Sequence, residues 1–377
     1  MKWEYKTLDQ LGTVSRGKSK HRPRNDPKLF GGKYPFIQTA DVKNADYYIT
    51  KYSDTYNESG LAQSKLWDKG TLCITIAANI ADTGVLAFPA CFPDSIMGFV
   101  PFEGVANTRF IKYCFDRLQR DCKQISQGTA QDNLSWEKLS TIKFCIPEYK
   151  EQCRIADILS AYDDLIENNQ KQIKLLEEAA QRLYKEWFVD LRFPGHENTK
   201  IVDDVPEGCS RTNINEILTF HRGYDLTKNE MKAGRYPVVG STTVIGYHNE
   251  FKIKGPGIVT GRSGSLGKYQ FIWDNFWPHN TSLYISDYKD HNIFFVYSLL
   301  QTVDFASLNN GGAIPTLNRN VLSNIEVIEP TDELQEMFAK IAESQYQKIK
   351  NLEKQNNQLK MARDALLPKL MSGEVEV

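Results

Sequence analysis

The stretch NNGGAIPTLNRNVLSNIEVIEP at residues 309–330 has a second copy in SQGTAQDNLSWEKLSTIKFCIP at residues 126–147. A shift of 183 residues aligns the two stretches without a gap. The shift superposes Gly128 on Gly311, Leu134 on Leu317, Leu139 on Leu322, Ile142 on Ile325 and Pro147 on Pro330. Self-similarity at one fixed spacing indicates an internal repeat. The chain is therefore predicted to consist of two similar halves.

The repeat extends well beyond these stretches. The same shift relates Gly84 to Gly267 and Leu183 to Leu366, and Gly17 has an upstream counterpart in Gly223 after insertions. Each half begins with short apolar runs broken by Gly, Pro and Asn, which is typical of strands and turns. A long segment that favours helix follows. We expect an α/β protein in which strand-rich globular domains, at 1–146 and 193–329, alternate with helical regions at 147–192 and 330–377.

Both helical regions have apolar residues in alternating steps of four and three. That period of 3.5 predicts a coiled-coil seam. The seam positions are Ile155, Leu159, Tyr162, Ile166, Asn169, Ile173, Leu176 and Leu183 in the first region, and Phe338, Ile349, Leu352, Asn356, Leu359 and Leu366 in the second. An internal pseudo-two-fold makes the two helices antiparallel, so that they separate the globular domains. The alternative is that each amphipathic helix packs only on its own domain.

Two asparagines interrupt the otherwise apolar seam. If the helices are antiparallel and cross near residue 171, Asn169 and Asn356 face each other. An unpaired buried amide is costly, and one polar layer can fix the register of a coiled coil. The sequence thus predicts that Asn169 and Asn356 lie within one helical turn of each other. The alternative is that both amides point to solvent.

Composition restricts the class of protein. A chain of 377 residues with 41% hydrophobic residues can bury more than one core. Its seven cysteines contain no C-x-x-C pair, which argues against a disulfide framework or a Cys-rich zinc site and favours the reducing cytoplasm. The histidines show no ligand spacing, and the start MKWEYKTLDQ lacks the apolar segment of a signal peptide. We expect no metal site and no membrane span.

The net charge of −1 hides an uneven distribution of charge. Residues 1–147 hold 20 Lys and Arg against 15 Asp and Glu, and the densest basic run is SRGKSKHRPRNDPK at 15–28. Such a run is suited to phosphate groups. A solvated loop is the alternative, because charge runs usually face water.

Several motifs resemble those of one protein family. KEQCRIADIL, LYKEWFVDLRFPG and LLPKLMSGEVEV are similar to the conserved helical regions of the specificity subunit of Type I restriction-modification systems. YPVVGSTTVIGYHNEF, GRSGSLGKY and NFWPHNTSLYI resemble one of its target recognition domains. The resemblance covers essentially the whole chain. It depends on the order of the motifs, since none of them is a catalytic signature.

The resemblance implies a DNA-binding, non-catalytic protein of host defence. Each target recognition domain reads one half of an asymmetric bipartite site, and the coiled coil fixes the spacer between the halves. The helices recruit two modification subunits, which methylate adenine with S-adenosylmethionine. Restriction subunits, which use ATP and Mg, complete the complex. No cofactor is expected in this chain.

Candidate DNA contacts are cationic, amide, hydroxyl or aromatic side chains near the duplicated loops and strand ends. Arginine and lysine suit phosphate or guanine, and amides can pair with adenine. The candidates are Arg16, Lys18, Lys20, Arg22, Arg24, Asn79, Gln127, Gln131, Arg222, Tyr224, Arg262, Ser263, Ser265, Asn309 and Asn310. Alternatively, the amides satisfy turn backbones, and GRSGSLG is a tight turn between strands.

Two other classes of function stay open at this point. The sequence contains no D/N-P-P-Y/F motif, no G-x-x-x-x-G-K-[ST] loop and no H-E-x-x-H, so an enzyme needs an unrecognised constellation. Nuclease or methyltransferase activity of the purified chain alone would reveal one. A scaffold protein would use its coiled coil for assembly and its globular domains to bind protein or sugar. Competition between specific and random duplex DNA distinguishes a scaffold from a DNA reader.

Overall fold

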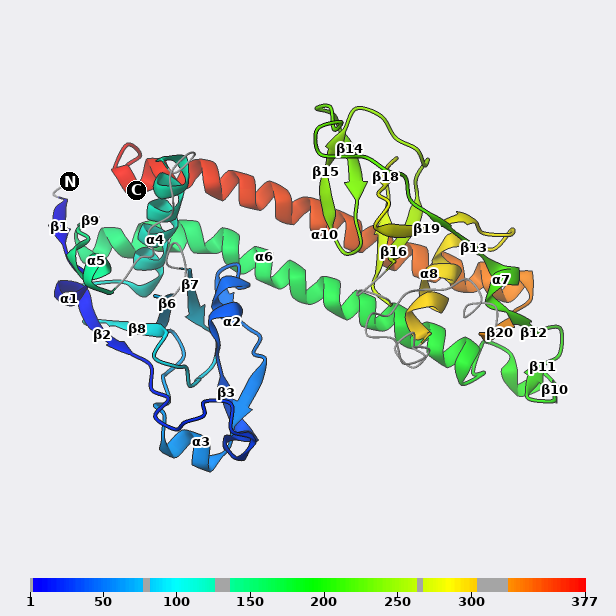
Figure 1. Cartoon of the computed structure of the whole chain (residues 1–377), viewed down its shortest axis with the longest axis horizontal. Coiled ribbons are helices and arrows are strands. Elements are labelled where there is room, and N and C mark those ends of the chain that lie inside the picture. Colours follow the sequence, from blue (N-terminus) through cyan, green and yellow to red (C-terminus); the bar gives the residue numbers. More distant parts are fainter. Residues whose placement is uncertain (1–2, 77–81, 126–135, 263–266, 304–324) are drawn as a thin grey trace. The chain divides into compact units, whose positions relative to one another are not determined.

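The computed structural model describes residues 3–76, 82–125, 136–262, 267–303 and 325–377 (Figure 1). It contains two compact units. Unit 1 comprises residues 1–169 and 354–377, and unit 2 comprises residues 170–353. Within the described ranges, no helix has the length and apolar character needed to cross a membrane.

Unit 1 is built on a five-stranded sheet with the order β2-β8-β6-β7-β4. Its strands are β2 (Gly12–Arg16), β4 (Tyr48–Ile49), β6 (Leu72–Thr75), β7 (Thr83–Leu86) and β8 (Ile96–Pro101). All neighbours are antiparallel except β4 and β7. Side chains alternate between the faces of a strand. Leu72 and Ile74 therefore join one core with Phe110 of α4, whereas Cys73 joins a second core with Trp67.

Shorter elements surround this sheet. Strand β3 pairs with β5, and β1 pairs with β9. These elements are β1 (Glu4–Lys6), α1 (Leu8–Leu11), η1 (Pro27–Leu29), β3 (Phe30–Phe36), α2 (Thr39–Lys43), β5 (Asp54–Tyr56), α3 (Glu58–Ala62), α4 (Thr108–Ile125), α5 (Trp136–Thr141) and β9 (Phe144–Ile146).

Unit 2 repeats this plan. Its main sheet has the order β13-β19-β16-β17, which matches β2-β8-β6-β7 of unit 1. The pair β12 and β20 corresponds to β1 and β9, and α8 takes the place of α4. The elements are β12 (Ser210–Asn213), β13 (Thr219–Arg222), β16 (Gly257–Gly261), β17 (Tyr269–Ile272), β19 (Ser282–Asp287), α8 (Ile293–Thr302) and β20 (Glu326–Glu329). The duplication predicted from the sequence is therefore present in the topology.

A second, three-stranded sheet of unit 2 has the order β15-β14-β18. In it, β14 is antiparallel to β15 and parallel to β18. The remaining elements are η3 (His196–Asn198), β10 (Ile201–Val202), β11 (Val205–Pro206), α7 (Ile214–Ile217), β14 (Tyr236–Val239), β15 (Val244–His248) and β18 (Trp277–Pro278).

The two long helices are α6 (Tyr149–Tyr184), which continues as a π-helical turn at Lys185–Val189, and α10 (Asp332–Ser372). Their first residues differ by the 183 positions of the sequence repeat. Each begins just after β9 or β20. The predicted fold class, strand-rich domains with two long helices, is confirmed.

In unit 1, the first part of α6 packs antiparallel to the last part of α10. Asn169 Nδ2 donates to Asn356 Oδ1 at 2.9 Å, and both residues are buried. Further along, Asp163 forms an ion pair with Arg363. Burial raises the pKa of the Asp163 carboxyl, although Arg363 and the Tyr113 hydroxyl oppose this shift. The predicted pairing of the seam asparagines is confirmed within unit 1.

The seam side chains are buried or half-buried throughout both helices. In unit 2, the end of α6 enters an aromatic core in which the Tyr184 and Phe188 rings lie 5.7 and 5.4 Å from that of Phe295. The repeat relates Tyr184 to Leu367 and Phe188 to Met371, and these two are buried in the core of unit 1. Each unit is therefore completed by the last turns of a long helix. The pseudo-two-fold between the units stays a prediction.

Candidate nucleic-acid interface

In unit 1, one edge of the main sheet gathers the end of β2 and the start of β8. Arg16 is the last residue of β2 and lies opposite Met97, and the Gly17 N–H donates to the Ile96 carbonyl at 2.9 Å. The end of β6 reaches the same edge, because Thr75 pairs with Ile96. We call this region the Arg16 edge.

Unit 2 has the equivalent region at the end of β13. Arg222 lies opposite Leu283 of β19, and the Gly223 N–H donates to the Ser282 carbonyl at 3.0 Å. Strand β16 ends here at Gly261, which pairs with Ser282. Arg262 follows directly. We call this region the Arg222 edge.

Glycine is required after each of these arginines. A Cβ atom on Gly17 would lie 2.2 Å from the Phe92 carbonyl oxygen, and one on Gly223 would lie 2.1 Å from that of His279. No side chain fits such a close approach of two backbones. The upstream pairing of Gly17 with Gly223 therefore reflects the same packing in both units.

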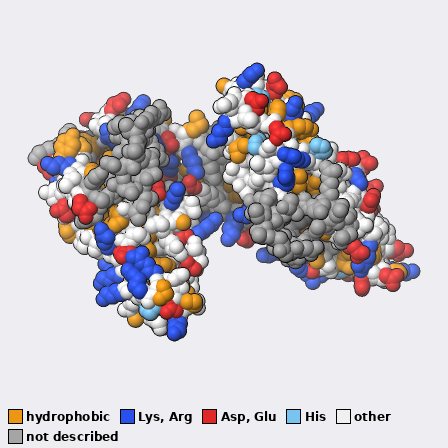
Figure 2. Space-filling model, viewed as in Figure 1, with side chains coloured by type: hydrophobic (Ala, Val, Ile, Leu, Met, Phe, Trp, Pro, Cys, Tyr) orange, Lys and Arg blue, Asp and Glu red, His pale blue; other side chains and the backbone are white. Residues whose placement is uncertain are grey.

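The basic segment after β2 contains two kinds of cation. Arg16, Lys18 and Lys20 are exposed and form no ion pair with any residue that the structure describes. Arg24 instead forms an ion pair with Asp94 at 2.7 Å, and Arg22 lies 4.0 Å from the same carboxylate. These two arginines tie the segment to the loop that precedes β8. Lys and Arg side chains gather on this part of unit 1, over β3 and α3 (Figure 2).

The Arg222 edge contains a comparable link. Arg222 lies 3.9 Å from Asp225, which also accepts a hydrogen bond from Asn280 in the loop before β19. Tyr224 is half-buried, and its hydroxyl lies 3.0 Å from that of Tyr284. Its backbone N–H donates to the Pro278 carbonyl at 2.8 Å. Tyr224 thus helps to position the loop, and its contact with DNA stays a prediction.

The other candidates can be located only in part. Arg262 is half-buried, and its backbone N–H donates to the Thr281 carbonyl at 3.2 Å. The remaining candidates lie outside the described residues; they are Asn79, Gln127, Gln131, Ser263, Ser265, Asn309 and Asn310.

A pair of glutamines was missed in the sequence. Gln152 and Gln335 are related by the 183-residue shift, and both are buried. Gln152 Oε1 accepts from the Asn107 N–H at 3.1 Å, and Gln335 Oε1 accepts from the Asn292 N–H at 2.7 Å. Each glutamine therefore binds the backbone just before the helix that packs on the main sheet. Identity at the repeat spacing is the signal that could have revealed them.

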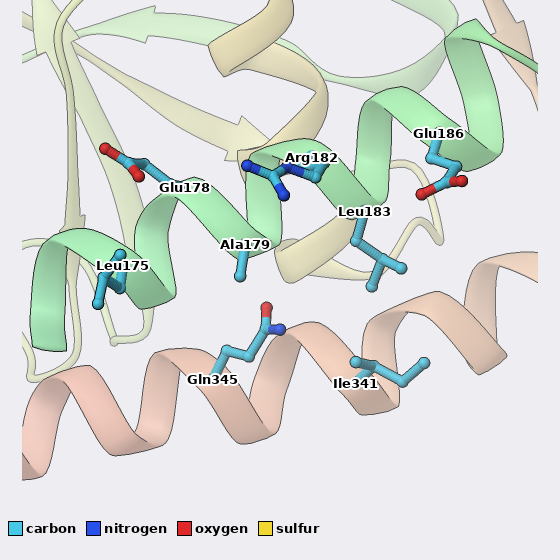
Figure 3. A pocket seen from close by; sticks show the side chains of 8 residues that line it. All are labelled: Leu175, Glu178, Ala179, Arg182, Leu183, Glu186, Ile341 and Gln345. Atoms are coloured by element: carbon cyan, nitrogen blue, oxygen red, sulfur yellow. The ribbon is translucent and has the colours of Figure 1, made fainter.

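The helices of unit 2 form a hollow of about 310 Å³ (Figure 3). Leu175, Ala179 and Leu183 of α6 line it from one side, and Ile341 and Gln345 of α10 line it from the other. The Gln345 Oε1 atom is buried and has no hydrogen-bond partner in the part of the chain that the structure describes. Leu175 is 64% exposed and Ile341 is 42% exposed, so this paired-helix surface is accessible and apolar, and the Gln345 acceptor lies beneath it.

Among the described residues, no group of three or more His, Cys, Asp or Glu could hold a metal ion.

The sequence model for the "Type I restriction modification DNA specificity domain" matches residues 1–178 and 206–361. This match spans most of the chain. The chain belongs to the Type I restriction-modification specificity family. It is the DNA-specificity subunit of a Type I complex, which is the non-catalytic component.

Relatives and a solved structure agree with membership of the specificity family. The Type I restriction enzyme MjaIX specificity subunit of Methanocaldococcus jannaschii is 26% identical over 411 residues, covering 100% of this chain and 94% of the relative. The EcoR124I/EcoR124II specificity subunit of Escherichia coli is 23% identical over 206 residues, covering 50% of this chain and 48% of the relative. The Type I S subunit of M. genitalium shares the fold with a TM-score of 0.56 and 19% identity, covering 98% of this chain and 96% of that structure.

Proposed function

We propose that each unit reads one half of an asymmetric bipartite DNA site through its arginine edge. The observation that carries this proposal is the duplicated edge itself. Arg16 and Arg222 end equivalent strands, and an equivalent glycine follows each of them. The neighbouring side chains differ, with Lys18 and Lys20 in unit 1 and Tyr224 in unit 2. The two edges therefore share a backbone arrangement but present different side chains, as expected if they bind half-sites of different sequence.

The charged side chains at these edges suit phosphate contacts, which are distinct from the contacts that read bases. Exposed cations such as Lys18 and Lys20 can neutralise phosphates and release counterions, which adds affinity without sequence information. Base contacts require side chains that reach the edges of base pairs in a groove. The Arg24–Asp94 ion pair and the Asn280–Asp225 hydrogen bond link the loops from which such side chains project.

The two long helices are the proposed binding site for two modification subunits. The hollow in unit 2 offers exposed apolar surface at Leu175 and Ile341, which suits a partner helix that carries apolar side chains. The modification subunits would bring S-adenosylmethionine and methylate one adenine in each half-site. Restriction subunits would bring ATP and Mg, so this chain would take part in no bond-forming or bond-breaking step.

The helices are also proposed to fix the spacer between the half-sites. Helix α6 alone has 36 residues, which corresponds to about 54 Å at a rise of about 1.5 Å per residue. The described cysteines are free thiols, which supports the cytoplasm as the location of the complex.

Methylation mapping of the host genome tests this function. The genome should contain a bipartite adenine-methylated motif that disappears when this gene is deleted. Replacing residues 1–147 with the first domain of another family member should change one half of the motif and leave the other half and the spacer unchanged. A change in both halves would contradict independent reading by the two units. A motif that survives deletion of the gene would contradict the proposed function.

A further inference from the structure

The hairpin formed by β14 and β15 contains a β-bulge at Ile245. Val238 pairs with Gly246, but Val239 pairs with Val244, so Ile245 is the extra residue on its strand. Successive side chains of a regular strand point to opposite faces, and a bulge redirects them. Val244 is 42% exposed and Ile245 is 45% exposed. Two consecutive branched apolar side chains are therefore both accessible to a ligand.

This bulge lies at the Arg222 edge. The His279 N–H donates to the Val239 carbonyl at 2.9 Å, and Ser241 Oγ donates to the Thr281 carbonyl at 2.8 Å. That same Thr281 carbonyl accepts the Arg262 N–H. A Cβ atom on Gly240 would lie 2.8 Å from Ile245 Cγ2, so the Ile245 side chain covers the turn of the hairpin. Figure 1 shows β14 and β15 beside β18, which leads into β19.

The charges around the hairpin favour a polyanion over an apolar protein partner. Lys232, Arg235, Lys252 and Lys254 are exposed on the segments that flank it. The acids are fewer. Asp225 is held by Arg222 and Asn280, Glu230 accepts hydrogen bonds from the Thr227 N–H and hydroxyl, and Glu250 is exposed. In Figure 2, Lys and Arg side chains lie among hydrophobic and acidic ones on this part of unit 2.

Only one base presents an apolar group in the major groove. Thymine carries a C5 methyl group there, and apolar side chains recognise it by contact. A two-stranded β-ribbon fits into the major groove. We propose that Val244 and Ile245 read the methyl group of a thymine in the half-site bound by unit 2. This inference deepens the proposed function and rests on it.

The test uses the full chain assembled with its modification subunits. Its binding is measured to duplexes that carry the motif found by methylation mapping. Each thymine of the motif is replaced in turn by deoxyuridine, which lacks only the methyl group. The wild-type complex should bind about fourfold more weakly when the contacted thymine is replaced, as expected for the loss of one buried methyl group. The sensitive positions should fall within one half of the motif.

The Val244→Ala/Ile245→Ala variant should bind the thymine and deoxyuridine duplexes equally. Ile201→Ala/Val202→Ala is the matched control, because these residues are 58% and 62% exposed on β10 of the same unit. The control should keep the fourfold discrimination. Since both pairs are exposed, neither variant should impair folding, and equal binding of random duplex by all three proteins checks this.

Two results would overturn the inference. The wild type could be insensitive to every replacement, or the Val244→Ala/Ile245→Ala variant could keep the discrimination. If a variant that keeps the discrimination also assembled poorly with modification subunits, the bulge would be assigned to a protein partner. In each case preference for the motif over random duplex would persist, so the proposed function would stand. If the wild-type complex did not prefer the motif over random duplex, both this inference and the proposed function would be overturned.

Discussion

Lys18 and Lys20 differ from the two arginines that follow them, because no acidic side chain in the described part of the chain pairs with either lysine. Replacing both lysines with alanine should weaken DNA binding about equally for all sequences. It should also reduce the slope of log K against log salt by about 2, since each lysine–phosphate contact contributes roughly 0.9. Binding measured at four or five salt concentrations gives the slope.

Lys33→Ala is the control for this pair, because Lys33 is exposed but lies 3.2 Å from Glu58. It should leave the slope nearly unchanged. An unaltered slope in the Lys18→Ala/Lys20→Ala variant would exclude this segment from the DNA interface.

Gln335 shows how one buried side chain supports the start of a helix. Replacing it with alanine leaves the Asn292 N–H without its acceptor, so the free energy of unfolding should fall by about 1–3 kcal/mol. Denaturant unfolding, followed by hydrogen exchange of α8, measures the loss. Gln347→Ala, at an exposed position of the same helix, should change the stability little. Equal effects of the two substitutions would refute this role of Gln335.

The sequence predicted some contacts between residues but not others, and the difference is whether a periodic pattern specifies the contact. The pairing of Asn169 with Asn356 follows from a periodic seam and one symmetry assumption, so it could be derived without the structure. The Arg24–Asp94 pair joins residues 70 positions apart in irregular segments, where no periodic pattern specifies contact. The bulge at Ile245 depends on strand register, which alternation of apolar residues alone does not fix.

At the scale of the helix pair, the polar layer in unit 1 contains the two buried amides of Asn169 and Asn356, and the exposed Gln355 also accepts a hydrogen bond from Asn169 Nδ2 at 3.0 Å. Asn169→Leu alone removes the partner of the buried Asn356 amide and should cost about 1–3 kcal/mol of stability. Asn169→Leu/Asn356→Leu removes both amides and should recover most of that loss, because two matched apolar residues can replace a buried polar pair. Urea unfolding of the full chain compares the variants. This account would be contradicted if the double variant lost as much free energy of unfolding as the Asn169→Leu and Asn356→Leu variants lose together.

The helix ends were recognisable as motifs, but their role required the structure. LYKEWFVDLRFPG and LLPKLMSGEVEV look unrelated letter by letter, apart from their spacing in the repeat. Both supply the last buried turns of a long helix to a unit core, using aromatic residues in unit 2 and Leu and Met in unit 1. Different side chains can fill equivalent spaces when volume and polarity are kept.

At the scale of the whole molecule, unit 1 is discontinuous in sequence whereas unit 2 is continuous. Replacing Leu367, Leu370 and Met371 with alanine removes three side chains that are at most 3% exposed in the core of unit 1. Each such change typically costs about 2–5 kcal/mol, so unit 1 should unfold. Hydrogen exchange should show loss of protection in β6 and β8 and retained protection in β16 and β19. The Met361→Ala control, at a position 73% exposed, should change neither unit.

The split composition of unit 1 has a consequence for synthesis of the protein. The described core of unit 2 lies entirely within residues 170–353, so unit 2 can fold while translation continues. Unit 1 is made first but lacks part of its core until residues 354–377 have left the ribosome. Unit 1 therefore keeps part of its apolar surface exposed to solvent until the last segment of the chain has been synthesised. Premature termination after unit 2 would release a chain whose later domain is folded and whose earlier one is not, which is the kind of product that chaperones and proteases remove.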